Sequence, residues 1–187
     1  MFEKGTPREL FGGAVAAILP SAVLDVSDIR QVPDSQEAFL YPESDAFLSI
    51  EVLQRVPPGD DAEAARYHFD VLAEENGAID KEITEIHALR LEPKKAVTSD
   101  DLTPSPMFLY GRQKARKFNQ PQANEVDILI ALFRIATSKA TADVVVSASI
   151  PTESTGLVDR DAIKSDFQAL VSSFHILDFA LFAPTTA

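Results

Sequence analysis

The sequence of 187 residues contains no cysteine, only three histidines and no long apolar run. The absence of cysteine excludes a disulfide framework, a zinc ribbon and a thiol nucleophile. No histidine is spaced from another as metal ligands are. No apolar stretch reaches the roughly 18 residues of a membrane-spanning helix, and the N-terminal MFEKGTPREL lacks the apolar part of a signal peptide. We therefore expect a soluble chain with no metal and no cofactor.

Motifs that mark common enzyme classes are also missing. The sequence has neither GxGxxG nor GxxxxGK[ST], and no GxSxG that would present a serine nucleophile. His68 falls on the apolar stripe of a predicted helix, where a buried, hydrogen-bonded histidine is more common than a general base. The acidic pairs Asp60–Asp61, Glu74–Glu75 and Asp100–Asp101 are more typical of solvated helix ends and loops than of a catalytic dyad. Nothing in the sequence favours an enzyme.

The charge is strongly unbalanced. The chain has 17 basic and 29 acidic residues, which gives a net charge of -12 and a sequence pI near 4.6. This acidity disfavours nucleic acid and anionic membranes as partners and favours a basic protein surface. Repulsion between copies of the same charge also favours a monomer. The length fits one domain over residues 1–187, with residues 1–8 and 184–187 predicted to be flexible.

Hydrophobic periodicity predicts more strands than helices. Strand patterns cover Leu10 to Leu19, Ala46 to Val56, Ile79 to Leu91, Met107 to Phe118, Asp127 to Ala136 and Asp143 to Ile150. The last two are joined by a short turn, which predicts an antiparallel hairpin. One helix is predicted between a cap at Asp60 and a stop at Asn76 and Gly77, and another over Asp159 to Phe174. We expect an α+β fold, an antiparallel sheet with helices on both faces and the apolar C-terminal segment docked onto it.

Three segments are candidates for binding. The second half of Leu10 to Glu37 combines both signs of charge with amide groups, as exposed, ordered binding loops do. Glu92 to Pro106 is a polar loop of a length that is uncommon unless the loop is functional or mobile. The strand around Arg112 to Lys117 is densely basic, either because it balances nearby acids or because it receives an acidic partner.

The most specific pattern begins with LFGGA at Leu10 to Ala14. It continues with Pro20, DVS at Asp25 to Ser27 and RQVPDSQE at Arg30 to Glu37. Weaker support comes from SIEVLQ at Ser49 to Gln54, KFNQ at Lys117 to Gln120, ALFRI at Ala131 to Ile135 and FHILDFALF near the end. Together these segments, which span nearly the whole chain, resemble the Ran guanine nucleotide release factor family, the Mog nuclear import proteins.

The resemblance implies an antiparallel sheet of roughly six strands between α-helices, the fold shared with the PsbP extrinsic proteins of photosystem II. It also implies a protein of the nucleus and cytoplasm that is not an enzyme, binds the GTPase Ran, loosens its guanine nucleotide and supports nuclear import. Whether a second Ran-binding protein joins the complex stays open. Carried over by position, the Ran-binding residues are Asp25, Arg30, Asp34, Gln36, Glu37, Glu51 and Gln54.

Among these implied Ran-binding residues, Gln54 departs from the family pattern, and Asp25 and Arg30 have an alternative role. The family typically has acids at the positions of both Glu51 and Gln54, so Gln54 retains hydrogen bonding but loses one charge. Asp25 and Arg30 could instead pair with each other and hold the loop in shape.

Three alternatives to Ran binding remain. A non-enzymatic adaptor of the same fold could bind a different basic protein. A PsbP-like protein of a photosynthetic lumen would require a transit peptide, which the sequence does not show. An enzyme could use Glu92 to Pro106 as a lid, but the sequence offers no catalytic constellation beneath it.

Overall fold

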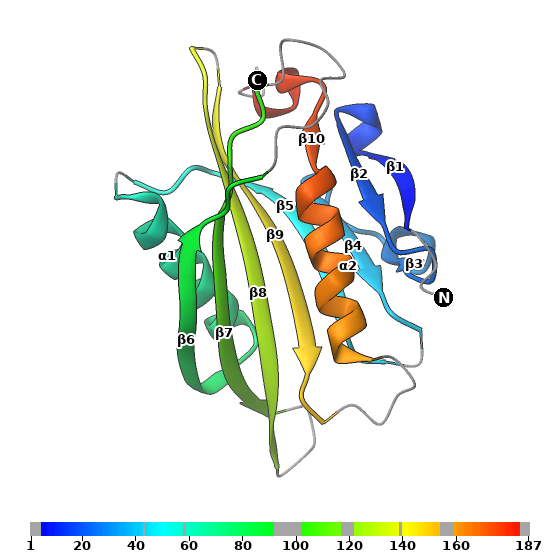
Figure 1. The fold of residues 1–187 in the computed structure, drawn as a ribbon, viewed down its shortest axis with the longest axis vertical. Coiled ribbons are helices and arrows are strands. Elements are labelled where there is room, and N and C mark those ends of the chain that lie inside the picture. Colours follow the sequence, from blue (N-terminus) through cyan, green and yellow to red (C-terminus); the bar gives the residue numbers. More distant parts are fainter. Residues whose placement is uncertain are drawn as a thin grey trace.

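A long antiparallel sheet forms the centre of the fold in the computed structural model, which describes residues 5–42, 44–57, 59–91, 102–116, 122–138, 140–153 and 159–183. Its strands are β3 (Leu24–Asp25), β4 (Gln36–Leu40), β5 (Phe47–Leu53), β6 (Ala78–Ala88), β7 (Met107–Arg116), β8 (Ala123–Ala136) and β9 (Thr141–Pro151). Within the described ranges the order across the sheet is β3-β4-β5-β9-β8-β7-β6, with every pair antiparallel (Figure 1). The predicted sheet is therefore confirmed, and the two-residue β3 extends it beyond six strands.

A smaller sheet lies beside the first and contains β1 (Thr6–Leu10), β2 (Val15–Leu19) and β10 (His175–Ile176), in the order β1-β2-β10. The single strand predicted over Leu10 to Leu19 is wrong, because the chain reverses within it. The turn at Phe11–Gly13 has positive φ at all three residues, 51° at Phe11, 66° at Gly12 and 93° at Gly13. Two adjacent glycines allow this turn, since glycine has no Cβ to clash in that region.

Among the residues that the structure describes, two α-helices flank the large sheet, α1 (Asp61–Glu75) and α2 (Arg160–Ser173). The predicted cap is confirmed, because the Asp60 carboxylate accepts the Glu63 N–H at 2.7 Å. Gly77, with φ of 61°, ends α1 as expected of a residue in the left-handed region. Asp159 caps α2 in the same way, accepting the Asp161 N–H at 3.0 Å.

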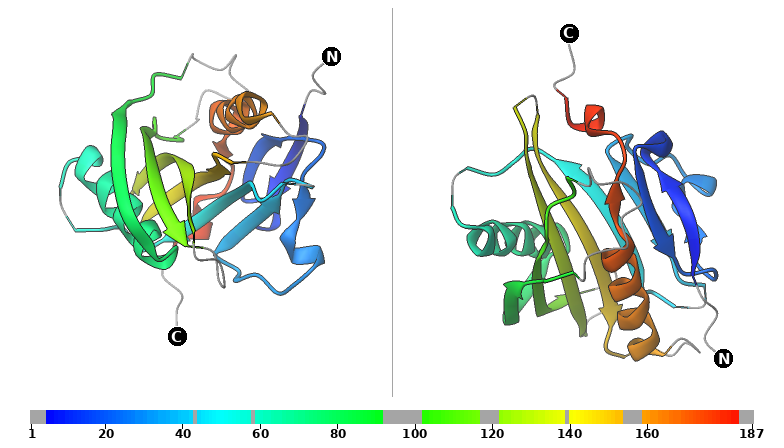
Figure 2. Two further views of the ribbon diagram at one scale, coloured as in Figure 1. Left: turned by 90° about the horizontal axis from the view of Figure 1, so that it is seen from below. Right: turned by 45° about the horizontal axis from the view of Figure 1, so that its top comes forward.

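Strand β8 is buried on both faces. Its Leu129, Ala131 and Phe133 belong to a core shared with α2 and the small sheet. Its Ile128, Ile130 and Leu132 belong to a second core beneath α1. The two helices cover different parts of the large sheet (Figure 2). Helix α1 lies over β6 to β8 on one face, whereas α2 and the small sheet lie on the opposite face, toward the other edge of the sheet.

The C-terminal segment docks as predicted. Ile176 pairs with Val15, and the backbone N–H groups of Leu177 and Asp178 both donate to the Ala14 carbonyl, at 2.8 and 3.1 Å. At the other terminus, where flexible residues are predicted up to position 8, residues 6–8 form part of β1.

Several sequence-based boundaries fall outside the described residues. These include residues 92–101 of the predicted long loop, Lys117 and Phe118 at the end of the basic strand, and residues 184–187. Strand β4 is the main element missed, because Gln36 to Leu40 has two polar residues followed by three apolar ones and no alternation.

Candidate functional site

Gln36 and Glu51 form the centre of the predicted surface, because antiparallel pairing of β4 with β5 places them directly opposite each other. Side chains of directly paired residues project from the same face of a sheet. On β5, Glu51 shares this face with Ser49 and Leu53, and Leu53 packs against the core beneath α1. The Gln36–Glu51 pair therefore lies on the α1 face, near the edge of the sheet.

The Glu51 carboxylate is half-buried and accepts a hydrogen bond from the Ser49 hydroxyl at 3.2 Å. Burial raises its pKa above the ordinary value, and the charge of Glu75 at the end of α1 adds to the rise. Hydrogen bonds from Ser49 and Gln36 and the nearby His68 act in the opposite direction. The site thus holds a partly desolvated acid, which gains more from a cationic partner than an acid in free solvent.

Asp34 lies just before the start of β4, and Gln54 lies just after the end of β5, at the same end of this strand pair. The Gln36 N–H donates to the Pro33 carbonyl at 2.9 Å, which closes a tight turn around Asp34. The Val52 N–H donates to the Ser35 carbonyl at 2.8 Å, so this turn extends the pairing of β4 with β5. Asp34 and Gln54 are both exposed, as contact residues must be.

Glu37 does not share the surface of its neighbour Gln36. It pairs with Ile50, which belongs to the core of the α2 face. Its carboxylate accepts the N–H of Phe11 at 2.6 Å and so holds the strained turn between β1 and β2. The sequence predicts Glu37 as a binding residue, but in the structure its carboxylate supports the turn at Phe11.

Asp25 is the last residue of β3, and Arg30 lies on the segment that follows it. Asp25 accepts hydrogen bonds from the Ser27 N–H and hydroxyl, at 2.9 and 2.6 Å, and so caps the short 3-10 turn at Val26–Asp28. Arg30 is exposed, and among the described ion pairs none joins it to Asp25. Ile29, between the two, has 64% of its surface exposed. Arg30 and Ile29 are therefore available for contact with a partner, whereas the Asp25 carboxylate stabilises the loop by capping its 3-10 turn.

A buried polar network fixes the chain that leaves β5 beside this surface. Asp143 on β9 contacts His68 of α1 at 2.9 Å, Arg134 of β8 at 3.2 Å and the Val56 N–H at 3.1 Å. Arg134 also donates to the Val56 carbonyl at 3.0 Å. The predicted role of His68 as a buried, hydrogen-bonded residue is confirmed. Sequence reasoning missed Asp143, because its partner His68 is 75 residues away in the chain.

Arg112, the first residue of the predicted basic strand, balances nearby acids, which is the first of the two roles predicted for that strand. Arg112 pairs with Asp127 at 2.9 Å and with Glu125 at 3.4 Å, and both partners lie on the adjacent strand β8. Over the described ranges, no group of histidines and acids is placed to hold a metal ion. Within those ranges, the helices are too short and polar to span a membrane.

Comparisons with known proteins identify the family and the fold of this chain. A family model described as "Ran-interacting Mog1 protein" matches residues 8–151, which include every predicted contact residue. The Ran guanine nucleotide release factor of Danio rerio is 34% identical over 94% of this chain and 98% of its own, and that of Homo sapiens is 32% identical over 94% and 95%. The crystal structure of the Saccharomyces cerevisiae Ran-binding protein Mog1p, 26% identical, superposes with a TM-score of 0.71 over 96% of this chain and 98% of that one, which confirms the predicted fold class. The chain belongs to the family of Ran-interacting Mog1 proteins.

Proposed function

We propose that this protein binds the GTPase Ran, promotes release of its guanine nucleotide and thereby supports nuclear import. The observation that carries the proposal is the family match over residues 8–151, together with relatives named Ran guanine nucleotide release factor and nuclear import protein Mog1. The net charge of -12 fits a partner with a basic surface.

The contact surface in this proposal is centred on Glu51 and extends to Gln36, Asp34 and Gln54 at the ends of β4 and β5. Arg30 and the exposed Ile29 provide further contact beyond the Asp25 cap. Glu37 acts indirectly, by fixing the turn at Phe11. The resemblance implied seven Ran-binding residues. In this proposal, Asp25 and Glu37 stabilise the loops and the other five contact Ran.

Release of nucleotide requires that the protein bind one state of Ran more tightly than another, since a ligand with equal affinity for two states shifts neither. In our proposal the Glu51 surface binds basic side chains of Ran that are better exposed when the nucleotide is absent. By linkage, bound nucleotide must weaken the affinity of Ran for this protein by the same factor.

The proposed role is non-enzymatic and involves a monomer in the nucleus and cytoplasm, with or without a second Ran-binding protein. We also propose that residues 1–187 form one domain, because both hydrophobic cores share strand β8. The second candidate is an adaptor with the same fold that binds a different basic protein. It rests on the same acidic surface and differs only in its partner.

Release of a fluorescent guanine nucleotide from purified Ran tests the proposal. We expect wild-type protein to accelerate release and Glu51→Gln, which keeps the shape of the side chain, to weaken binding to Ran about tenfold, because a desolvated interface acid pairs with a base. Glu85→Gln is the matched control: it also removes one carboxylate, but from an exposed position on strand β6 outside the proposed surface.

The outcomes separate the two candidates. If wild-type protein binds Ran without changing nucleotide release, the release mechanism is wrong. If it does not bind Ran at all, the adaptor with another basic partner becomes the better proposal. Equal loss in Glu51→Gln and Glu85→Gln would mean that overall charge, and not the Glu51 surface, determines binding.

A further inference from the structure

A groove lies between the strand pair β6–β7 and helix α2, on the face opposite α1. It consists of two cavities of about 790 and 240 Å³ that share Glu85, Phe108, Phe167 and Gln168 as lining residues. Single ligand pockets usually have volumes of about 300–1,000 Å³. The groove is therefore large enough for a small organic molecule.

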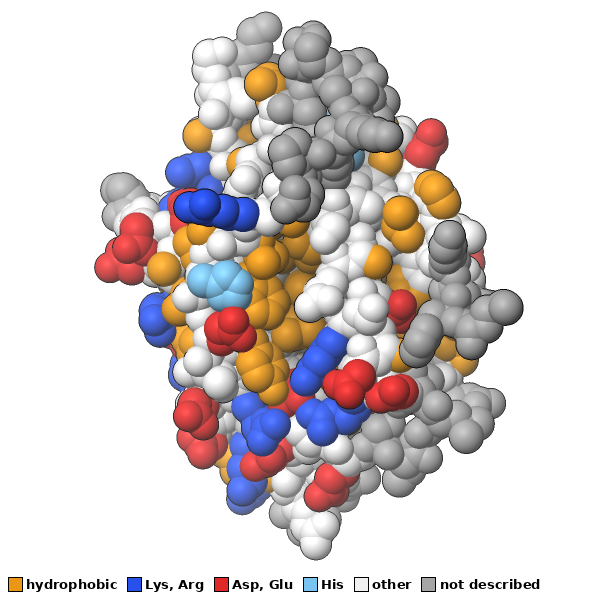
Figure 3. Space-filling view, viewed as in Figure 1, with side chains coloured by type: hydrophobic (Ala, Val, Ile, Leu, Met, Phe, Trp, Pro, Cys, Tyr) orange, Lys and Arg blue, Asp and Glu red, His pale blue; other side chains and the backbone are white. Residues whose placement is uncertain are grey.

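The groove exists because the elements that the structure describes on this face do not cover the whole sheet. Helix α2 and the small sheet pack over β9, β5 and the middle of β8. On the same face, Phe108 and Tyr110 of β7 stay only half-buried beside the helix. Figure 3 shows hydrophobic side chains gathered in this hollow between the strands and the helix, with basic side chains beyond each end.

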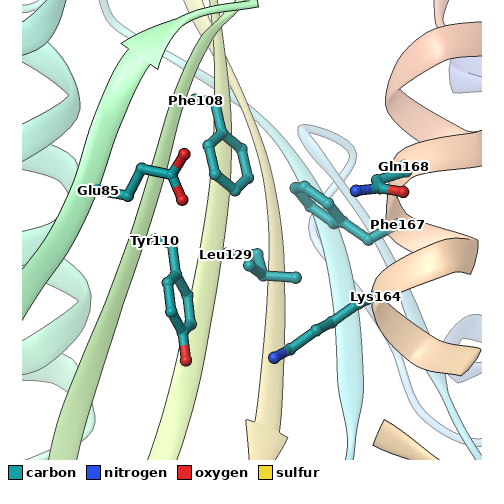
Figure 4. A pocket seen from close by; sticks show the side chains of 7 residues that line it. All are labelled: Glu85, Phe108, Tyr110, Leu129, Lys164, Phe167 and Gln168. Carbon is teal, nitrogen blue, oxygen red and sulfur yellow. The ribbon is translucent and has the colours of Figure 1, made fainter. Parts of the chain in front are cut away.

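The walls of the groove are aromatic. Phe108 of β7 faces Phe167 of α2 across it, with ring centroids 6.5 Å apart, and the ring of His87 lies 5.3 Å from that of Phe108. Leu129 of β8 lies between the two walls (Figure 4). Aromatic walls at this spacing provide flat apolar surfaces for a ligand body.

Lys164 gives one end of the groove a positive charge. Its Nζ lies 5.3 Å from the centre of the Tyr110 ring and 4.0 Å from the buried Asp127 carboxylate. That carboxylate already pairs more closely with Arg112 and Arg160. Three basic side chains therefore surround the single buried carboxylate of Asp127. The only other acid in these ion pairs is Glu125, which pairs with Arg112. The Lys164 charge is left incompletely neutralised and one-third exposed, at 34%.

The other charged groups of the groove leave the end beside Lys164 positive. Glu85, the carboxylate that lines both cavities, has an oxygen 3.2 Å from Nδ1 of His87, a contact that is an ion pair only when His87 is protonated. In Figure 4, Glu85 lies beside Phe108, whereas the Lys164 amine and the Tyr110 hydroxyl lie together farther along the groove. Arg90 lines the larger cavity and adds a second positive charge.

We propose that this groove binds a small amphipathic anion, with an apolar body between Phe108 and Phe167 and an anionic group beside Lys164. The site is separate from the proposed Ran surface, because Glu51 projects from the α1 face and the groove lies on the α2 face. The protein can then hold both partners at once.

Decanoate and decyltrimethylammonium, used below their micelle concentrations, test this proposal as probes with equal chain length and opposite charge. Two-dimensional NMR of the labelled full chain follows the backbone signals of Phe108, Tyr110 and Phe167. We expect decanoate to shift these signals in a saturable way and the cation to bind at least about tenfold more weakly, since the charged contact at Lys164 would be repulsive.

Three variants make the test specific. Lys164→Gln should weaken decanoate binding about tenfold and remove the preference for the anion. Gln168→Trp, at an exposed lining position, should weaken both probes by occupying the groove. Lys81→Gln is the control, because it removes a positive charge from the α1 face, where Lys81 pairs with Asp70 at 2.7 Å. It should bind decanoate like the wild type.

Circular dichroism establishes that each variant is folded before titration. Decanoate binding that is unchanged in Lys164→Gln, or signal shifts that map elsewhere, would overturn the proposal. Shifts at the groove caused by an acidic, apolar-rich peptide but by neither small probe would also overturn it and indicate a protein-docking surface.

Discussion

At the residue scale, Glu51 shows how the proposed binding surface costs stability. Burial raises the pKa of this carboxyl above its ordinary value of 4.5, and the nearby charge of Glu75 acts in the same direction. The folded state therefore holds the proton more tightly than the unfolded state, and the stability of the wild type falls as pH rises from 4.5 through the raised pKa.

Glu51→Gln should therefore stabilise the protein at neutral pH by roughly 1 kcal/mol or less, while weakening binding to Ran. The gain should disappear below about pH 4, where the wild-type carboxyl is protonated in both states. Urea denaturation of both proteins across this pH range measures the difference. A variant that is less stable than the wild type at pH 7 would show that the ionised carboxylate is favourably paired.

The Asp143 carboxylate has the opposite balance. Burial alone would raise its pKa, but hydrogen bonds from His68 and Val56 and the charge of Arg134 hold the pKa below its ordinary value of 3.8. Its contribution to stability is therefore fully present above pH 3.8 and is lost as pH falls through the depressed pKa.

We expect Asp143→Asn to lower the free energy of unfolding by about 3 kcal/mol at pH 7, since the buried Arg134 loses its principal acid. Urea titration checks this value. Lys81→Gln, which breaks an exposed pair with Asp70, should cost less than about 1 kcal/mol and serves as the comparison. Equal stability of Asp143→Asn and wild type would mean that the network carries no net ionic stabilisation.

At the scale of elements, the packing of α1 on β7 depends on a missing side chain. A Cβ at Gly111 would lie 2.6 Å from the Glu82 carbonyl oxygen and 2.8 Å from the Phe69 ring. Phe69 is buried in the core beneath α1, so the helix approaches the sheet closely only because residue 111 is glycine. Overpacking at such a contact typically costs about 1–3 kcal/mol.

Gly111→Ala should therefore destabilise the protein by about 2 kcal/mol in thermal or urea denaturation. The cost should be smaller in a Phe69→Leu background, because leucine lacks the outer ring atoms that the new methyl group would meet, and the double-mutant cycle measures this coupling. If the two effects were simply additive, the Phe69 contact would not be the cause of the loss.

At the scale of the whole molecule, the net charge of -12 governs encounter with a basic partner. Long-range attraction accelerates association, and salt screens it beyond a distance of about 10 Å at 0.1 M. We expect the association rate constant with Ran to fall roughly tenfold between low and high salt, with a much smaller change in the dissociation rate constant. Stopped-flow binding at several salt concentrations measures both, and a salt-independent association rate would contradict electrostatic steering.

The sequence by itself determined the features that depend on neighbouring residues. The cap at Asp60, the stop at Gly77, the continuous apolar run of β8 and the β8–β9 hairpin all follow from local preferences and periodicity. The family also follows from the sequence, because LFGGA and RQVPDSQE are local patterns, and the family model includes both.

Only the tertiary structure decided which side chains lie together. Gln36 and Glu37 are adjacent in a strand and so face opposite sides of the sheet, but only the register of β4 on β5 places Gln36 beside Glu51 and Glu37 beside Ile50. The groove beside Lys164 results from how far α2 extends over the sheet. These outcomes depend on pairing and packing between segments far apart in the chain, and periodicity within one segment does not encode the position of another.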